Sequence, residues 1–169
     1  MTKTIHTAKT MEIALARYFD HRINIIIPNI STGMHLNHEA DLLILNPNGY
    51  ATEIEIKVSS SDIKADAMKN HHHRSRKIKK FYYAVPKNLK DCQDLPKDCG
   101  LICVDDNLNC TTIRAPRLNT KAVKFTDKEI MHLLHLGCMR IWNLKEKILN
   151  LQTYCKTSGK EARRSPARH

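Results

Sequence analysis

The sequence predicts an α/β (α+β) fold with a mixed central sheet flanked by helices, in the order helix, three strands, helix, strand, plus a long C-terminal helix. Three observations predict it. Apolar residues recur at helical spacing near both ends of the chain, short β-branched runs lie between them, and Pro, Gly and Asn bound those runs. A length of 169 residues suits one domain with its own core.

The first expected helix spans residues 7–18, because its apolar side chains fall on one face: Met11, Ala14, Leu15 and Tyr18. Residues 24–28 then form a nearly continuous apolar run that ends at Pro28. Such a run is typical of a strand buried on both faces. We therefore expect this strand to be central in the sheet.

A β-hairpin is predicted over residues 39–57. An apolar run at residues 42–45 reads as one strand, and residues 46–49 supply a turn with Pro and Asn-Gly. The second strand begins at Tyr50. The hairpin brings acidic residues of both strands together.

The returning strand of this hairpin has one charged and one apolar face. Successive side chains of a strand point to opposite faces, so Glu53, Glu55 and Lys57 share one face while Ile54 and Ile56 share the other. An alternative interpretation of the charged face is that it is solvent-exposed and that Lys57 forms a surface ion pair, which would contribute little to stability.

A second helix is expected from about Asp62 to Asn70, after a serine cluster typical of a helix N-terminus. We expect Ile63, Asp66 and Ala67 to face the sheet. β-branched and aromatic content predicts the remaining strands at residues 81–86, 100–104 and 110–114.

The C-terminal part opens with a capping box at residues 126–129, which predicts the start of a long amphipathic helix. Residues 156–169 have almost no apolar side chains, so we expect a basic disordered tail after a single domain at residues 1–155. The apolar residues of the helix are Ile130, Leu133, Leu134, Cys138, Ile141, Trp142, Ile148 and Leu149.

Composition narrows the cellular context. Hydrophobic residues make up 41% of the chain and charged residues 27%, with no apolar run near the ~20 residues of a membrane span. We expect a cytoplasmic protein without a membrane partner, in the host cytoplasm if the chain is phage-encoded. The six cysteines include no C-x-x-C pair and are expected to be reduced thiols.

Charge is unevenly distributed along the chain. Residues 1–60 carry five Lys/Arg and six Asp/Glu, whereas residues 61–90 carry nine Lys/Arg and two Asp/Glu. An acidic centre followed by a basic segment suits a polyanion held beside metal. The expected nucleic-acid-binding residues are Ser59, Ser60, Lys64, Lys69, Arg74, Arg76, Lys77 and Lys80.

The hairpin carboxylates predict a metal site. Asp41 and Glu55 lie on adjacent strands, and like charges so close repel unless a cation lies among them. Hard oxygen ligands of this kind suit Mg²⁺ or Mn²⁺. Further acidic residues that could join the site are Glu12 from the first helix, Glu39 and Glu53.

One strand of the hairpin begins with an acidic residue, Asp41, and the next ends with an E-x-K motif, Glu55 to Lys57. This arrangement resembles the active-site motif of the PD-(D/E)XK nuclease superfamily. The chain also resembles the MmcB-like DNA-repair branch of this superfamily over roughly residues 36–150. The segments that carry this resemblance are residues 53–66, 81–86, 95–104 and 113–116.

That resemblance implies a restriction-endonuclease-like αβββαβ core. It implies Asp41 and Glu55 as metal ligands and Lys57 beside the attacked phosphate. It also suggests a part for further residues around the site: Ser59, Ser60, Asp62 and Asp66.

Two functions follow from these features. The first is a metal-dependent nuclease that hydrolyses phosphodiester bonds in DNA, in repair, recombination or phage DNA processing. Asp41, Glu55 and the backbone carbonyl of Ile56 would hold Mg²⁺ or Mn²⁺, and Lys57 would stabilise the transition state. The second is a catalytically silent nuclease-fold module that binds DNA as an accessory protein. The sequence does not exclude RNA as the substrate. It is also compatible with a homodimer.

Overall fold

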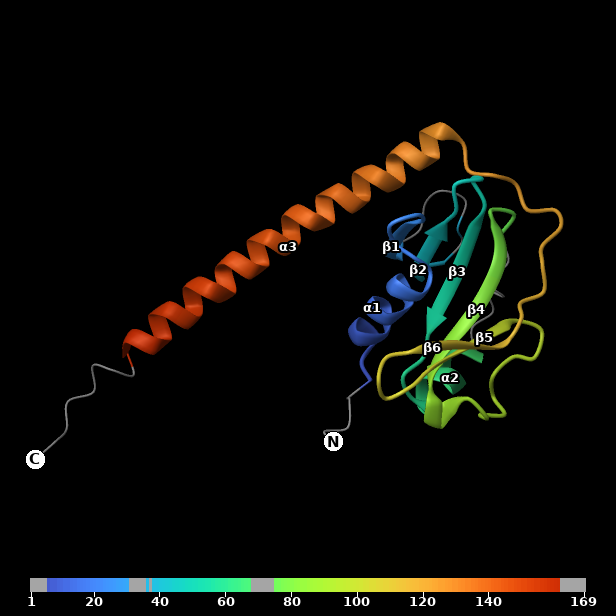
Figure 1. The fold of residues 1–169 in the computed structure, drawn as a ribbon, viewed down its shortest axis with the longest axis horizontal. Helices are drawn as coiled ribbons and strands as arrows, with labels where there is room; N and C mark the ends of the chain where they lie inside the picture. Colours follow the sequence, from blue (N-terminus) through green and yellow to red (C-terminus); the bar gives the residue numbers. More distant parts are fainter. Residues whose placement is uncertain (1–5, 31–35, 37, 68–74, 162–169) are drawn as a thin grey trace, which may run out of the picture. The chain divides into compact units, whose positions relative to one another are not determined.

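The computed structural model describes residues 6–30, 36, 38–67 and 75–161, with side chains for all of these except Ala67 and residues 155–161. The chain forms two compact units, Met1–Glu129 and Ile130–His169. In its described residues the first contains a six-stranded sheet, the α-helices α1 and α2, and a short 3-10 helix at Lys87–Leu89 (Figure 1). All candidate site residues belong to this unit.

The sheet is mixed, as predicted. Its strands follow one another in chain order, with β1 to β3 antiparallel, β3 to β5 parallel, and β6 antiparallel to β5. The predicted order of helix, three strands, helix and strand is confirmed. The strands are β1 (Ile25–Ile30), β2 (Ala40–Leu45), β3 (Ala51–Ile56), β4 (Ile78–Pro86), β5 (Gly100–Val104) and β6 (Cys110–Arg114).

Helix α1 (Ala8–Tyr18) covers one face of the sheet. Thr7 caps its N-terminus through a reciprocal hydrogen-bond pair with Thr10. Met11, Ala14 and Leu15 of the predicted stripe pack into the core, whereas Tyr18 is exposed. Even-numbered side chains of the strands complete this core: Leu42, Ile44, Ile54, Ile56, Tyr82, Ala84, Ile102 and Val104.

The opposite face of the sheet is covered by α2 (Ser60–Ala67) and the loop before β5. Ile63 of α2 packs with Tyr83, Val85 and Leu101, as expected for a residue facing the sheet. Gly100 fits directly beneath the Tyr82 ring, since a Cβ atom there would lie 2.3 Å from Tyr82 Cδ1. The buried functional side chains share the α2 face of the sheet.

The expectation of a central first strand is wrong. Among the residues that the structure describes, β1 is an edge strand and its only strand neighbour in the sheet is β2. Pro28 lies inside it and has no N–H for a second ladder, so the strand suits an edge rather than the middle of a sheet. The apolar run that suggested two-sided burial is instead half-exposed at Ile25 and Ile26.

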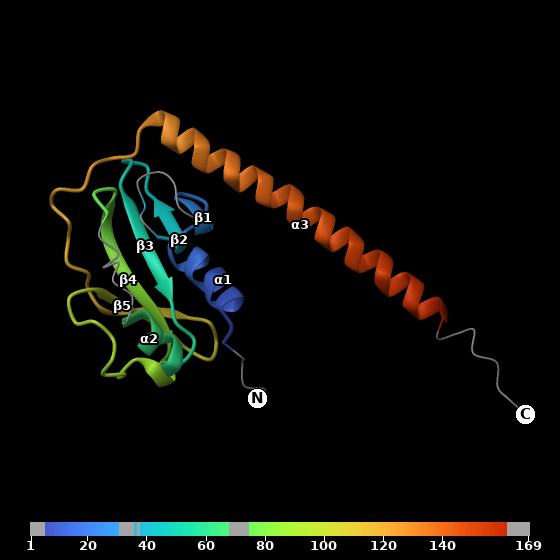
Figure 2. The same cartoon turned by 180° about the vertical axis from the view of Figure 1, so that it is seen from behind.

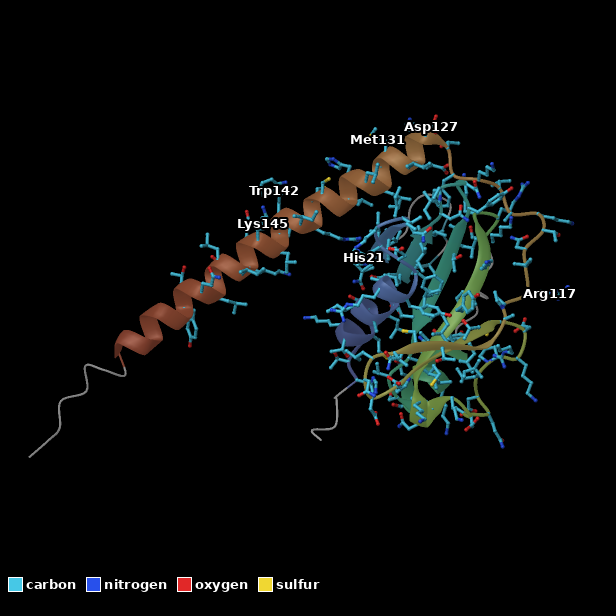
Figure 3. The ribbon with its side chains drawn as sticks, viewed as in Figure 1. His21, Arg117, Asp127, Met131, Trp142 and Lys145 are labelled. Carbon is cyan, nitrogen blue, oxygen red and sulfur yellow. The ribbon has the colours of Figure 1, made fainter. Side chains whose placement is uncertain are left out.

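Helix α3 (Asp127–Glu161) begins at the predicted capping box, where Glu129 accepts hydrogen bonds from the backbone and hydroxyl of Thr126. It continues through Glu161, past the expected start of the tail at residue 156. Leu133 is buried, but many apolar side chains of the helix are exposed, among them Leu134, Ile141, Trp142, Ile148 and Leu149. Figure 3 shows Trp142 beside Lys145, whose ammonium lies 4.8 Å from the indole centroid.

Two expectations from composition can be compared with the described part of the chain. No helix there is long and apolar enough to cross a membrane. The cysteines whose side chains are described are all free thiols: Cys92, Cys99, Cys103, Cys110 and Cys138.

Candidate active site

The β2–β3 hairpin places Asp41 directly across from Glu55. Leu42 pairs with Ile54 and Leu43 with Glu53, so the next pair outward joins the two acids. Asp41 Oδ2 also accepts a hydrogen bond of 2.7 Å from the backbone N–H of Ile56. One carboxylate oxygen thus fixes the end of the hairpin.

Lys57 follows directly after β3 and is buried, with its side chain 4% exposed. Its backbone N–H donates to Ala84 O at 3.0 Å, which ties the residue to β4. Its Nζ lies 2.8 Å from Glu55 Oε1, 3.0 Å from Asp66 Oδ1 and 3.9 Å from Asp62 Oδ1. The lysine is therefore clamped between a strand carboxylate and carboxylates of α2.

Asp66 is held in turn by Tyr83. The Tyr83 hydroxyl donates to Asp66 Oδ2 at 2.6 Å, and both side chains are buried. Tyr83 pairs with Glu55 in the parallel ladder between β3 and β4. The site is thus built from three strands, β2, β3 and β4, and from α2, which follows β3 in the chain (Figure 1).

Glu53 does not join this group. Its side chain is 0% exposed and is hydrogen-bonded to His38, whose Nε2 lies 2.5 Å from Glu53 Oε1. The Glu53 carboxylate, which the sequence suggested as a further member of the acidic site, is therefore placed beside His38 rather than in the clamp around Lys57. Among the described residues, no group of three or more His, Cys, Asp or Glu side chains could hold a metal ion.

The other acidic candidates lie outside the clamp around Lys57. Glu39 is exposed at the start of β2, where its charge contributes to the electrostatics of Asp41. Glu12 is half-buried on α1, which packs on the opposite face of the sheet from Glu55 and Lys57. The sheet itself separates Glu12 from the clamp.

Burial and neighbouring charges shift the pKa values of Asp41 and Lys57. Burial raises the pKa of the Asp41 carboxyl, and the hydrogen bond from Ile56 and the charge of Lys57 offset only part of this effect. Burial disfavours the charged form of Lys57, but hydrogen bonds and charges of Glu55 and Asp66 outweigh it and raise the pKa of its ammonium. Lys57 is a cation at neutral pH.

The donor chemistry of this end of the hairpin fits Mg²⁺ or Mn²⁺. Mg²⁺ commonly keeps several waters and binds one or two carboxylates. Asp41 and Glu55 supply two from adjacent strands of the hairpin, and Ile56, whose backbone carbonyl is the third expected ligand, follows Glu55 directly in the chain.

The expected nucleic-acid-binding residues fall into separate groups. Ser59 accepts a hydrogen bond from the Asp62 N–H at the start of α2, and Ser60 and Lys64 are exposed on that helix beside the site. Arg76 and Lys80 are exposed near the start of β4, at the other end of the sheet. Lys69 and Arg74 lie outside the described residues, as does the run His71, His72 and His73.

Lys77 is poorly suited to the phosphate contact expected of it. Its side chain is 10% exposed, and its Nζ lies 2.7 Å from Glu129 Oε2 and 3.1 Å from Lys124 O. An ammonium that already has a carboxylate and a carbonyl as partners would lose both on turning to solvent. Lys77 is a buried structural cation.

Sequence reasoning did not pair the residues that hold the site together. These residues are His38 and Tyr83, and neither is among the site residues that the sequence predicts. Both bind carboxylates through hydrogen bonds that cross between elements. Local patterns carry no signal for such pairs, although a His and a Tyr next to buried acids are the residue types able to satisfy them.

The comparison with known families now bears on this geometry. The model of the family described as DNA repair protein MmcB-like matches residues 4–147. The chain belongs to the MmcB-like family. The match includes the hairpin, α2 and β4, and therefore every residue of the clamp.

A solved structure supports the fold. The SPO1766 protein of unknown function from Silicibacter pomeroyi is similar with a TM-score of 0.61 and 16% sequence identity, over 87% of this chain and 94% of that chain. At that identity the likeness concerns the fold alone. No curated protein matches the chain.

Proposed function

We propose that this MmcB-like protein is a metal-dependent nuclease that hydrolyses phosphodiester bonds in DNA, in repair, recombination or phage DNA processing. The observation that carries the proposal is the opposition of Asp41 and Glu55 at the end of a hairpin, with Lys57 two residues further along. This is the arrangement for which the sequence resembles the PD-(D/E)XK superfamily. The family's link to DNA repair supports DNA as the substrate.

Asp41, Glu55 and the Ile56 carbonyl are the groups that would hold Mg²⁺ or Mn²⁺. Such an ion, when bound, polarises the scissile phosphate and lowers the pKa of an attacking water. The protein's own part is to keep the two carboxylates in register across the hairpin. The hydrogen bond from Ile56 N–H to Asp41 Oδ2 does this on one side, and Lys57 restrains Glu55 on the other.

Lys57 acts as a fixed positive charge in this proposal. Because its pKa is raised, it keeps its proton at neutral pH and does not serve as a general base. Its ammonium would stabilise the negative charge that develops on the phosphate during attack. Glu55 and Asp66 orient it, and Tyr83 orients Asp66.

A second function is favoured by one observation. The Lys57 side chain is only 4% exposed and already has carboxylate partners, so a phosphate would have to displace or join them. A catalytically silent DNA-binding module explains that burial without any rearrangement. In that case the clamp is a structural ion network.

A panel of labelled nucleic acids tests both functions. The purified full chain would be incubated with duplex, single-stranded, flap and junction DNA and with RNA, each with Mg²⁺, with Mn²⁺ and with EDTA. Metal-dependent cutting of any DNA supports the nuclease, and the RNA arm tests whether the substrate class is wider. Binding without cutting under every condition supports the silent module. A homodimer stays a prediction, which sedimentation of the same preparation would check.

A further inference from the structure

A segment after β6 brings three distant parts of the chain together. Residues 115–126, which we call the strap, run back beside β4 in both ribbon views (Figures 1 and 2). Backbone hydrogen bonds fix its position, from Asn119 N to Lys79 O at 3.0 Å, from Val123 N to Arg76 O at 2.8 Å, and from Phe125 N to Gly49 O at 2.8 Å. The strap thus joins the start of β4 to the turn between β2 and β3.

The joined segments carry positive charge only. Residues 46–50, 75–80 and 115–126 contain no Asp or Glu, and their basic residues are Arg76, Lys77, Lys79, Lys80, Arg117, Lys121 and Lys124. Glu129 neutralises Lys77. The other six are exposed or, for Lys79, half-exposed, and none is in an ion pair with another residue that the structure describes. Figure 3 shows Arg117 on the strap.

A β-bulge in β4 contains one of these lysines, Lys79. Ala51 pairs with Ile78 and Thr52 with Lys80, so Lys79 is an extra residue on β4 without a partner across the ladder. Its Nζ lies 3.6 Å from the centroid of the Tyr50 ring, and Lys124 Nζ lies 5.4 Å from the same ring. Two ammonium groups thus lie near one aromatic ring, that of Tyr50.

Two ammonium groups at one ring repel each other, and an anion beside them would relieve that repulsion. We propose that Tyr50, Arg76, Lys79, Lys80, Lys121 and Lys124 form a binding site, the basic platform, for the phosphate backbone of nucleic acid. The proposal extends the proposed function, because its ligand is the polymer on which that function acts. Such contacts position a nucleic acid without reading its sequence.

The platform lies far from Lys57. Tyr50 precedes β3 and Lys57 follows it, and at a rise of about 3.3 Å per residue the two are roughly 20 Å apart. That length corresponds to about six base pairs of duplex at about 3.4 Å each. The platform would therefore hold nucleic acid about half a helical turn from the phosphate nearest the candidate active site.

The test is the affinity of the full chain for a labelled duplex of about 20 base pairs, by fluorescence anisotropy in EDTA over a range of salt concentrations. Lys79→Gln with Lys124→Gln should weaken binding about tenfold at about 0.1 M salt and lower the slope of log affinity against log salt by about two. The matched control is Lys9→Gln with Arg17→Gln, which removes the same charge from exposed positions of α1. The control should change affinity by less than about twofold.

Substitutions of Tyr50 test whether its ring positions the lysines of the basic platform. Tyr50→Phe keeps an aromatic face for both ammonium groups and should bind like the wild type. Tyr50→Leu removes that face and should weaken binding by about threefold, with an unchanged circular dichroism spectrum. Equal affinities for Tyr50→Phe, Tyr50→Leu and the wild type would overturn the role of the ring.

The outcomes distinguish this inference from the proposed function. A wild type that binds but does not cut leaves the platform in place and overturns the nuclease. Binding that falls equally in the platform variant and in the α1 control overturns the platform, because net charge then explains the loss. A wild type that binds no nucleic acid overturns the platform and the proposed function together.

Discussion

Asp66 binds the ammonium of Lys57 at 3.0 Å, although one residue lies on α2 and the other follows β3. The second oxygen of Asp66 accepts the Tyr83 hydroxyl at 2.6 Å. A short helix and a neighbouring strand thus fix the orientation of one lysine. The position of Lys57 against Glu55 depends on tertiary packing as well as on the local spacing of the two residues.

Tyr83→Phe should destabilise the fold. It removes a buried hydrogen bond to a carboxylate, and bonds of that kind contribute about 1.5–3 kcal/mol to the free energy of unfolding. Urea unfolding followed by circular dichroism measures the change. Tyr18→Phe is the matched control, since the Tyr18 hydroxyl contacts Thr112 at the exposed surface. If the free energy of unfolding falls by the same amount in both variants, the hydrogen bond from Tyr83 to Asp66 does not stabilise the fold more than the exposed contact of Tyr18 does.

Divalent metal should stabilise the protein. Burial raises the pKa of Asp41, which means that its ionised form is disfavoured in the fold, and a bound cation would reverse this. We expect Mg²⁺ or Mn²⁺ to raise the Tm at neutral pH, and the rise to shrink as the pH falls and Asp41 takes up a proton. Differential scanning fluorimetry with and without EDTA gives both results.

The matched variant for the metal prediction is Asp41→Asn with Glu55→Gln. It keeps the size of both side chains but removes their charge, so the metal-dependent rise in Tm should disappear. Glu39→Gln serves as the control, because Glu39 is exposed and contributes only weakly at a distance. An identical Tm of the wild type in EDTA and in Mn²⁺ would contradict the metal site.

Local pattern was sufficient for most of the fold. The spacing of apolar residues predicted α1, the turn residues predicted the hairpin, and period-two alternation separated Glu55 and Lys57 from Ile54 and Ile56. These features depend on interactions between residues close in sequence. The sequence could therefore predict them without any knowledge of the sheet order.

Long-range partners were beyond such reasoning. The charge of Glu53 suggested a metal ligand, but the fold buries Glu53 against His38. Lys77 was predicted to bind nucleic acid, but the fold places it in an ion pair with Glu129. Pairs of this kind depend on which elements become neighbours. One residue, Pro28, did indicate that β1 lies at the edge of the sheet, because proline cannot donate a hydrogen bond to a second neighbouring strand. The apolar run around it indicated a central strand, and that indication was wrong.

The pair of Glu129 and Lys77 should make stability depend on acid pH. Burial opposes ionisation of Glu129, but hydrogen bonds from Lys77 and Thr126 outweigh it and lower the pKa of its carboxyl from 4.5 to about 2. A carboxyl with a lower pKa in the folded state stabilises the fold above its unfolded pKa. This stabilisation is lost as the pH falls from 4.5 toward about 2.

Urea unfolding of the wild type and of Glu129→Gln at several pH values checks this. The variant should be less stable near neutral pH by about 1.5–3 kcal/mol, the usual contribution of a charge-assisted hydrogen bond. The difference should narrow as the pH falls below 4.5. A difference that stays constant down to about pH 3 would show that the carboxylate charge is not what Lys77 stabilises.

Lys57→Ala separates an enzyme from a binding module. Under the proposed function it should reduce cleavage by about 100- to 1,000-fold, the usual effect of removing one preorganised group that stabilises transition-state charge. Ground-state affinity for DNA should change by less than about threefold, because many Lys and Arg side chains share it. Lys57→Arg should not restore the rate, since the planar guanidinium spreads its charge and occupies a different volume.

Stability is the confounding variable in that experiment, because Lys57→Ala leaves Glu55 and Asp66 buried without their cation. Breaking such a buried pair costs about 3–5 kcal/mol. Lys77→Ala is the matched control, since it breaks the buried ion pair with Glu129 at the other end of the sheet. It should lose comparable stability and yet retain cleavage when measured well below its Tm. Wild-type cleavage by folded Lys57→Ala, or an equal loss of cleavage in Lys77→Ala, would remove Lys57 from the proposed reaction.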